Sequence, residues 1–459
     1  MNTGKKLQIL DGKVQSDTTT TMGTEKLEIF CNDKPVGVLE KESRGYDTAF
    51  RFRYHESASE DQAVSLTMPT VERIYEGFRD LPDALQVSLP EGAVAQHLVD
   101  RFGKGVRLSD KFALLKLVGR NMTGRITAGG VRTPFTLEKR LLEMAGAGGQ
   151  TGWAQNILES AGKNGFGVSG VMPKLLVSET STSGFGDPYR AFSESILKME
   201  RSPHFGVCVA EHFALTASRN AGIPTVNAYL NHCGDALFIQ RFDIQDDGSR
   251  RGFEDACVLT GFSPVFKYDG CLEKLFIMIE GFVEEAHVTE DKTRLLRMLF
   301  LNDILRNGDA HLKNFGLIYT NPGDVRLAPS YDVLDTTLFL PADIPALTIR
   351  QFFPDEAPQH KRWMTESDID ELVDVADLPL VNGRQMRKEI LDSVWDSSAA
   401  YRRFLNTSSL TADHRAFGAR MLDALEARLR SLRPASAQRG TAVPKDIGDD
   451  TDHPAGDPR

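Results

Sequence analysis

An acidic loop reads Asn307-Gly308-Asp309-Ala310-His311-Leu312-Lys313-Asn314, and Ser330-Tyr331-Asp332 follows it after a short intervening segment. The loop holds an Asp and, five positions later, an Asn, and the second segment adds another Asp. Phosphoryl transfer from ATP needs three such groups, a carboxylate facing the acceptor hydroxyl and two hard oxygen ligands for magnesium. The catalytic loop of protein kinases has the same Asp-x-x-x-x-Asn spacing, although the Asp-Phe-Gly wording is absent around Asp332. The spacing therefore indicates a phosphotransferase site.

The same residues could instead form an ordinary turn, because Asn-Gly-Asp is typical turn chemistry. However, an amphipathic helix over 289–306, capped by Thr289, is expected to lead directly into the loop. A strand over 315–319, a turn at 321–324 and a second strand before Asp332 complete a connected pattern. This pattern favours phosphotransfer over the turn.

Composition narrows the class of protein. The 459 residues suggest two or three domains, and 41% apolar with 26% charged residues is typical of soluble globular proteins. No apolar run of about 18 residues predicts a membrane span, and five scattered cysteines without a CxxC pair predict reduced thiols in the cytoplasm and no zinc site. The net charge of -10 argues against general nucleic-acid binding, so DNA contact would come from a local patch or a partner.

Several segments can be assigned along the chain. Residues 1–24 are expected to be a disordered leader and 433–459 a disordered tail. Between them we expect a strand-rich module (25–145), a nucleotide-binding lobe with a glycine-rich loop (146–245) and a helical catalytic lobe (246–432). The module should contain strands at 27–31, 36–39 and 49–54 and helices near 70–80, 93–103 and 109–120. Later strands are expected at 174–178, 194–199, 226–230 and 236–242, and helices at 208–221, 366–376, 384–404 and 411–432. The order predicts an α+β, two-lobed, protein-kinase-like fold.

Two upstream patterns fit a nucleotide site. Residues 165–170 satisfy G-x-G-x-x-G and precede Lys174, and glycines allow backbone amides to approach phosphate. A chance match in a flexible linker is about equally good, and no Walker sequence follows. Lys198 lies on a predicted strand and Glu211 on the next helix, as in the kinase lysine–glutamate pair. A surface lysine followed by an unrelated glutamate would give the same sequence pattern.

The strand that ends at 237–243 lies where a linker between lobes belongs. Backbone groups there could hydrogen-bond adenine, and Phe242 could line its pocket. An ordinary strand terminus would look alike. For His311, hydrogen bonding that orders the loop is a better interpretation than metal ligation.

Taken together, residues 25–432 resemble the HipA-type serine/threonine kinases, the toxin half of bacterial toxin–antitoxin pairs. The strongest matches are 307–315 and Leu327-Ala-Pro-Ser-Tyr-Asp-Val333. Supporting matches are Leu89-Pro-Glu-Gly92, Gly170-Val-Met-Pro-Lys174, Gln240-Arg-Phe-Asp243 and Glu254-Asp255. The strand-rich module also resembles the one that precedes the kinase core in that family.

The resemblance implies roles by position. It implies Asp309 as catalytic base, Asn314 and Asp332 as Mg²⁺ ligands, and Glu211 as the ion-pair partner of Lys198. The ATP-binding residues that it implies are Ser169, Gly170, Lys174, Lys198, Gln240, Phe242, His311 and Lys313.

The family also implies regulation and partners. Members can phosphorylate a serine in the glycine-rich loop and inactivate themselves; Gly167 replaces one such serine, which leaves Ser169 as the candidate. Known substrates include aminoacyl-tRNA synthetases, and the usual partner is a helix-turn-helix antitoxin of the HipB type, through which any DNA contact would be indirect.

Two alternatives stay open. Aminoglycoside and choline kinases use a similar Gly-Asp-x-His-x-x-Asn loop but lack the 25–130 module. A catalytically weak co-repressor of a DNA-binding antitoxin is the other alternative, and the presence of all three acidic-loop residues weighs against it.

Overall fold

The computed structural model describes residues 23–432 except 45–46, 79, 104–106, 108, 137–138, 150–151, 162–164, 169–173, 179–193, 202 and 351–360. Most of the predicted leader, all of the predicted tail and the candidate Ser169 and Gly170 lie outside the described residues. Within the described ranges, none of the helices combines the length and the apolar run that crossing a bilayer needs.

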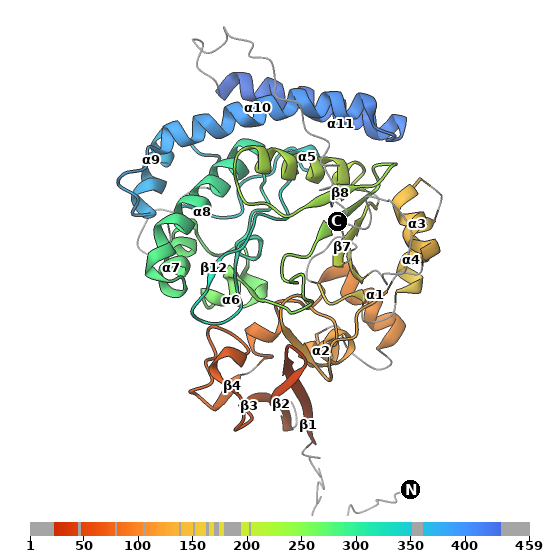
Figure 1. Ribbon diagram of the computed structural model, residues 1–459, viewed down its shortest axis with the longest axis vertical. Coiled ribbons are helices and arrows are strands. Elements are labelled where there is room, and N and C mark those ends of the chain that lie inside the picture. Colours follow the sequence, from red (N-terminus) through yellow and green to blue (C-terminus); the bar gives the residue numbers. More distant parts are fainter. Residues whose placement is uncertain are drawn as a thin grey trace, which may run out of the picture.

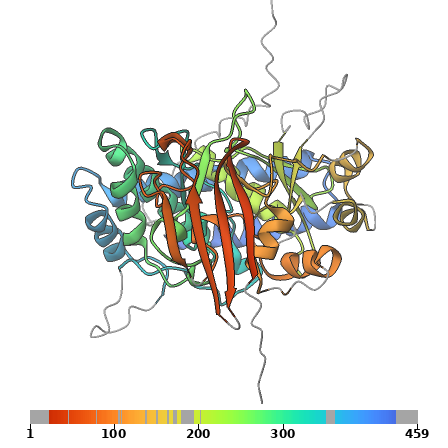
Figure 2. The ribbon, with the colours of Figure 1, turned by 90° about the horizontal axis from the view of Figure 1, so that it is seen from below.

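The N-terminal region is built on a five-stranded sheet, seen from below in Figure 2. Its strands are β1 (Gly23–Cys31), β2 (Lys34–Arg44), β3 (Asp47–Tyr54), β4 (Ile74–Phe78) and β5 (Ile126–Ala128), in the order β4-β3-β2-β1-β5. Asn32 and Asp33 both have positive φ, as the tight hairpin turn between β1 and β2 requires. Alternate residues such as Ile29, Leu39 and Phe52 are fully buried, so one face of the sheet covers a core.

The helix predicted near 70–80 is wrong, because this segment holds the edge strand β4, which pairs with β3. Ile74, Tyr75 and Phe78 are strand-forming residues, and Gly77 disfavours a helix. These strand-forming residues and the pairing with β3 together outweigh the helical pattern expected for the segment. The helices predicted near 93–103 and 109–120 are confirmed as α1 (Gly92–Phe102) and α2 (Lys111–Val118).

A second sheet has the order β6-β7-β9-β8. It consists of β6 (Lys174–Ser178), β7 (Glu194–Met199), β9 (Ala236–Gln240) and β8 (Ala228–Leu230), with α5 (Val207–Asn220) packed against β8 and β9. Two short helices, α3 (Lys139–Ala147) and α4 (Trp153–Ser160), lie beside it in the glycine-rich region (Figure 1). The predicted strands and the 208–221 helix are confirmed.

The C-terminal region is mostly helical, and Figure 1 shows its last two helices, α10 (Gly383–Thr407) and α11 (Ala412–Leu432), above both sheets. It also contains α6 (Ala256–Leu259), α7 (Leu272–Phe282), α8 (Glu285–Leu305) and α9 (Glu366–Val375). A small sheet of β10 (Gly252–Asp255), β11 (Gly316–Tyr319) and β12 (Arg326–Leu327) lies among them. Leu295, Leu299 and Phe300 bury α8 in the core of this region.

The cap predicted at Thr289 is wrong, since α8 begins at Glu285 and Glu284 is its N-cap residue. The polar first turns of α8 concealed its start. Its C-terminal end agrees with the expected position: Arg306 adopts a left-handed conformation with φ of 59°, which stops the helix and turns the chain into the acidic loop.

Candidate active site

The acidic loop leaves α8 through a glycine that the surrounding chain requires. A Cβ atom at Gly308 would lie 2.8 Å from the Ile344 carbonyl oxygen and would collide with the Asp343 carboxylate. The Gly308 N–H donates to Thr336 Oγ1 at 2.8 Å. These contacts fix the chain immediately before Asp309, which is partly open to solvent.

Asp332 and Asn314 lie next to each other. Asn314 Nδ2 donates to Asp332 Oδ2 at 3.3 Å, and Asn314 Oδ1 accepts from the His311 N–H at 3.0 Å. Asp332 has a φ of 56°, which is unusual for a residue other than glycine and is held by the surrounding contacts. The structure therefore brings together the two residues that the sequence suggested as magnesium ligands.

Lys198 joins the second sheet to this pair. Its Nζ lies 2.5 Å from Glu211 Oε1 and 2.5 Å from Asp332 Oδ1. Burial lowers the pKa of a lysine, but Asp332 and Glu211 together raise the pKa of Lys198 above its ordinary value. Burial also disfavours the charged form of Asp332, yet Lys198 and Lys174 hold the pKa of Asp332 far below its usual range. Both groups thus stay charged.

A second lysine faces the same carboxylate. Lys174 lies opposite Lys198 in the β6–β7 register and is buried. Burial lowers the pKa of Lys174, and Lys198 adds to this shift while Asp332 opposes it. Two lysine side chains therefore lie near Asp332, where their ammonium groups could pair with an anionic ligand such as phosphate.

Asp309 lies at the outer side of the loop. Tyr268 donates its hydroxyl to Asp309 Oδ1 at 2.6 Å. Partial burial raises the pKa of Asp309, as does the nearby Asp332, although the Tyr268 hydrogen bond and Lys267 oppose the shift. A carboxylate with a raised pKa is a better proton acceptor than an ordinary Asp.

His311 and Lys313 lie deeper than a nucleotide contact would suggest. His311 is 7% exposed, and burial lowers its pKa to about 4, so its ring is neutral near pH 7. Lys313 Nζ pairs with Asp255 Oδ2 at 2.9 Å and donates to the Val87 carbonyl at 3.3 Å. Lys313 therefore connects the loop to α6 and to the N-terminal region, and its suggested contact with ATP stays a prediction.

The two residues suggested for adenine lie at the end of β9. Gln240 Oε1 accepts from Asn227 Nδ2 at 2.9 Å. The Phe242 ring stacks on the ring of Tyr331, with centroids 5.8 Å apart, and Tyr331 directly precedes Asp332 in the chain. Phe242 thus borders the cluster, while Gln240 packs against a neighbouring loop.

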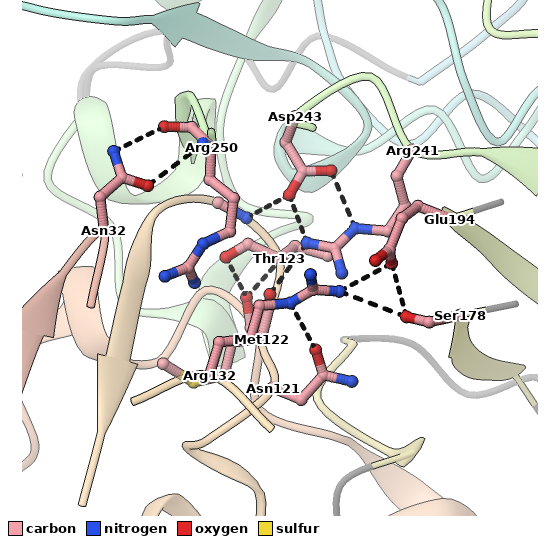
Figure 3. A network of polar contacts seen from close by, with 12 residues as sticks. Asn32, Asn121, Met122, Thr123, Arg132, Ser178, Glu194, Arg241, Asp243 and Arg250 are labelled. Carbon is pink, nitrogen blue, oxygen red and sulfur yellow. Dashed lines mark hydrogen bonds and ion pairs between the residues drawn. The ribbon is translucent and has the colours of Figure 1, made fainter. Parts of the chain in front are cut away.

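Arg241 and Asp243, which the sequence presents only as part of the 240–243 motif, form a buried connection between regions (Figure 3). Arg241 pairs with Asp243 at 2.5 Å and donates to the Met122 carbonyl at 3.0 Å. Asp243 also accepts from the Gly124 N–H at 2.6 Å. Arg132, which Figure 3 draws beside this pair, contacts Glu194 at the start of β7 at 2.7 Å. The motif therefore anchors the N-terminal region to the end of β9.

The residue types at this site fit a magnesium ion, although Asn314 turns its Nδ2 toward Asp332 and its Oδ1 toward the His311 N–H. Asp332 stays ionised, and a carboxylate and an amide oxygen are ligands that Mg²⁺ accepts. The Lys198 ammonium on Asp332 Oδ1 shows that this carboxylate already attracts a cation. Asn314 and Asp332 are thus the residues that would hold the ion.

Comparisons with known proteins agree with this architecture. A family model described as HipA-like C-terminal domain matches residues 166–398, and one described as HipA N-terminal domain matches residues 27–129. A Sinorhizobium fredii (strain NBRC 101917 / NGR234) protein named "Putative kinase Y4dM" is 28% identical over 272 residues. That alignment covers 55% of this chain and 61% of the relative, so the chain spans about three fifths of the curated relative that it matches.

Solved structures show the fold. A chain of the Shewanella oneidensis MR-1 toxin–antitoxin complex of HipA, HipB and operator DNA has a TM-score of 0.59 and 20% identity. The match covers 88% of this chain and 97% of that one, and it confirms the predicted fold class. The Helicobacter pylori proinflammatory kinase CtkA has 14% identity over 51% of this chain and 87% of its own, and its TM-score of 0.35 is too low to support a common fold. Since the C-terminal model alone matches half of the 459 residues, the chain belongs to the HipA family.

Proposed function

We propose that this chain is an ATP- and Mg²⁺-dependent serine/threonine protein kinase of the HipA type. One observation carries the proposal: Lys198 contacts both Glu211 and Asp332, and Asn314 contacts Asp332, at the end of the loop that begins with Asp309. This set contains a phosphate-binding cation, two oxygen ligands for a metal ion and a carboxylate base.

Each residue has a distinct role in this proposal. Lys198 turns from Asp332 to the nucleotide phosphates, and Glu211 keeps hold of its ammonium. Asn314 and Asp332 hold Mg²⁺, which when bound neutralises phosphate charge. Asp309 accepts the proton of the acceptor hydroxyl. Lys174 adds positive charge beside the phosphates, and Phe242 lies against the adenine.

A protein acceptor is favoured by two observations. The chain has an N-terminal region that aminoglycoside and choline kinases lack. This region is joined to the core through buried contacts such as that between Asp243 and Gly124. Two segments that hydrogen-bond to the acidic loop, through Lys267 to Leu312 and through Thr336 to Gly308, also expose large apolar side chains. These side chains are Val265, Phe266, Leu340 and Ile344, which are 68%, 52%, 60% and 51% exposed. Exposed apolar groups around a site are typical of protein contact rather than of a small polar acceptor.

The proposed biology follows the family. The acceptor is a cellular protein, with an aminoacyl-tRNA synthetase as the first to test, and its phosphorylation arrests growth. The proposed partner is a HipB-type antitoxin, since the Shewanella relative was solved with HipB and operator DNA. We place the kinase in the cytoplasm, and we propose Ser169, which lies outside the described residues, as its site of autophosphorylation.

Labelling a cell lysate with [γ-³²P]ATP and the purified protein tests this function. We expect one or a few labelled protein bands with the wild-type chain and none with Asp309→Asn. Label that appears only in small molecules would contradict a protein acceptor. Phosphopeptide mapping of the same reaction tests Ser169, and absence of phosphate there would reject self-inactivation at this residue.

A further inference from the structure

Tyr268 makes a contact with the proposed base that the nucleotide site does not explain. Its hydroxyl donates to Asp309 Oδ1 at 2.6 Å. Among the described residues, no other side chain donates to this carboxylate. Tyr268 follows the short 3-10 helix Pro264–Phe266 and is 41% exposed, so nothing about burial alone demands a hydroxyl here.

Several contacts hold the tyrosine in place. Its ring meets the buried His311 ring edge-on, with centroids 5.0 Å apart. Its carbonyl oxygen accepts from Lys361 Nζ at 3.0 Å. The preceding carbonyl, that of Lys267, accepts from the Leu312 N–H at 3.1 Å. The phenol is therefore fixed to the acidic loop on its ring and on its backbone, unlike a loose surface side chain.

The contact leaves one oxygen of Asp309 for chemistry. A general base must lie within hydrogen-bond reach of the proton that it accepts, and a carboxylate has two oxygens. Tyr268 occupies Oδ1 and leaves Oδ2 for the acceptor. Partial burial and the contact with Asp309 raise the pKa of Tyr268, so the phenol keeps its proton near pH 7 and remains a donor.

We propose that Tyr268 is a positioning residue, which fixes the Asp309 carboxylate through Oδ1 and presents Oδ2 to the acceptor hydroxyl. This inference rests on the proposed function of Asp309 as base. In the step that it supports, the acceptor proton passes to Oδ2 and the acceptor oxygen bonds to the γ-phosphorus. The bond from that phosphorus to the bridging oxygen breaks, ADP leaves with the electron pair, and Tyr268 keeps its proton.

Removal of the hydroxyl separates this role from simple packing. Transfer of ³²P from [γ-³²P]ATP to the labelled lysate protein is measured with Tyr268→Phe, which keeps the ring against His311. We expect kcat to fall about 10-fold, the scale of one hydrogen bond to a charged group. The KM for ATP should change less than about 2-fold. The acid limb of the pH profile should move to higher pH, because the ionised form of Asp309 loses a donor.

Two further variants complete the test. Tyr75→Phe is the matched control, since it removes a phenol hydroxyl that donates to the Pro69 carbonyl at 2.7 Å in the N-terminal region, and its kinetics should equal those of the wild type. Tyr268→Ala removes the ring as well and should be impaired at least as much as Tyr268→Phe. Melting temperatures identify variants that are merely unfolded.

Three results are informative against the proposal. A Tyr268→Phe enzyme with wild-type kcat and pH profile would overturn it, and an impaired Tyr268→Ala beside it would assign the ring to packing alone. A faster Tyr268→Phe enzyme would also overturn it, because the hydroxyl would then compete with the acceptor. Full activity in Asp309→Asn, measured in parallel, would instead reject the base assignment and with it the proposed mechanism.

Discussion

Glu211 offers a test of how the site divides one ammonium between two carboxylates. Lys198 Nζ lies 2.5 Å from both Glu211 and Asp332, and the three side chains are 9%, 4% and 34% exposed. Glu211→Gln removes the charge of one partner and keeps the size of the side chain. Lys198 is then left with Asp332 as its charged partner, and its hold on this carboxylate strengthens.

The size of the effect follows from these contacts. A hydrogen bond between charged groups contributes roughly 1.5–3 kcal/mol. When Glu211 loses its charge, the Lys198 ammonium interacts less with residue 211, and its contact with Asp332 becomes stronger by part of this amount. A gain of about 1.4 kcal/mol in the Lys198–Asp332 contact makes Asp332 about 10-fold less available to Mg²⁺. The free Mg²⁺ concentration that gives half-maximal rate should therefore rise about 10-fold.

Initial rates of phosphate transfer, measured across a series of free Mg²⁺ concentrations with ATP well below its KM, determine this constant, because Lys198 still holds Asp332 in the nucleotide-free enzyme. Glu200→Gln is the matched control, because the Glu200 side chain is only 7% exposed and pairs with His414 at 2.9 Å, outside the site. The control should lose stability without a change in Mg²⁺ requirement. An unchanged Mg²⁺ constant in Glu211→Gln, or an equal shift in Glu200→Gln, would show that Glu211 does not control how tightly Lys198 holds Asp332.

Two other outcomes follow from the structure. The pKa of Asp309 is raised above about 4, the ordinary pKa of Asp, and the base acts in its ionised form. We therefore expect kcat to fall as the pH drops through a value above about 4. A pH–rate profile that stays flat down to pH 4 would contradict this. Asp243→Asn leaves the buried Arg241 guanidinium without its charged partner and should lower the free energy of unfolding by about 3–5 kcal/mol. Denaturant unfolding measures this change, and Asp247→Asn, at an exposed Asp on the following turn, is the control. Equal stability of the two variants would show that the pair does not anchor the N-terminal region.

Local patterns made much of the site predictable. Asp309 and Asn314 lie on one loop. The helix before the loop and the strand after it both have regular hydrophobic patterns, so the order of helix, loop and strand could be predicted from the sequence. Lys198 and Glu211 lie on a strand and the next helix, and their contact needed only the assumption that the two elements pack. The edge strand β4 could not be read, because its pairing with β3 outweighs its own weak pattern.

Long-range contacts were the part that sequence could not supply. Asp243 accepts from Gly124, which lies 119 residues earlier, and no local signal marks either residue as a partner of the other. Tyr268 reaches Asp309 from 41 residues away and stands in a segment without a recognisable motif. The family resemblance implies a nucleotide contact for Lys313, and the sequence gives no sign of its buried pair with Asp255, which depends on the position of α6.

If Asp309 is the base of a phosphotransfer site, Asp309→Asn must slow phosphate transfer, and the rate of transfer by this variant tests the assignment. We predict a rate at least ~100-fold below that of the wild type, the low end for loss of a general base, with ATP affinity retained because Lys198, Asn314 and Asp332 are intact. Transfer at the wild-type rate by a folded Asp309→Asn protein would contradict the assignment.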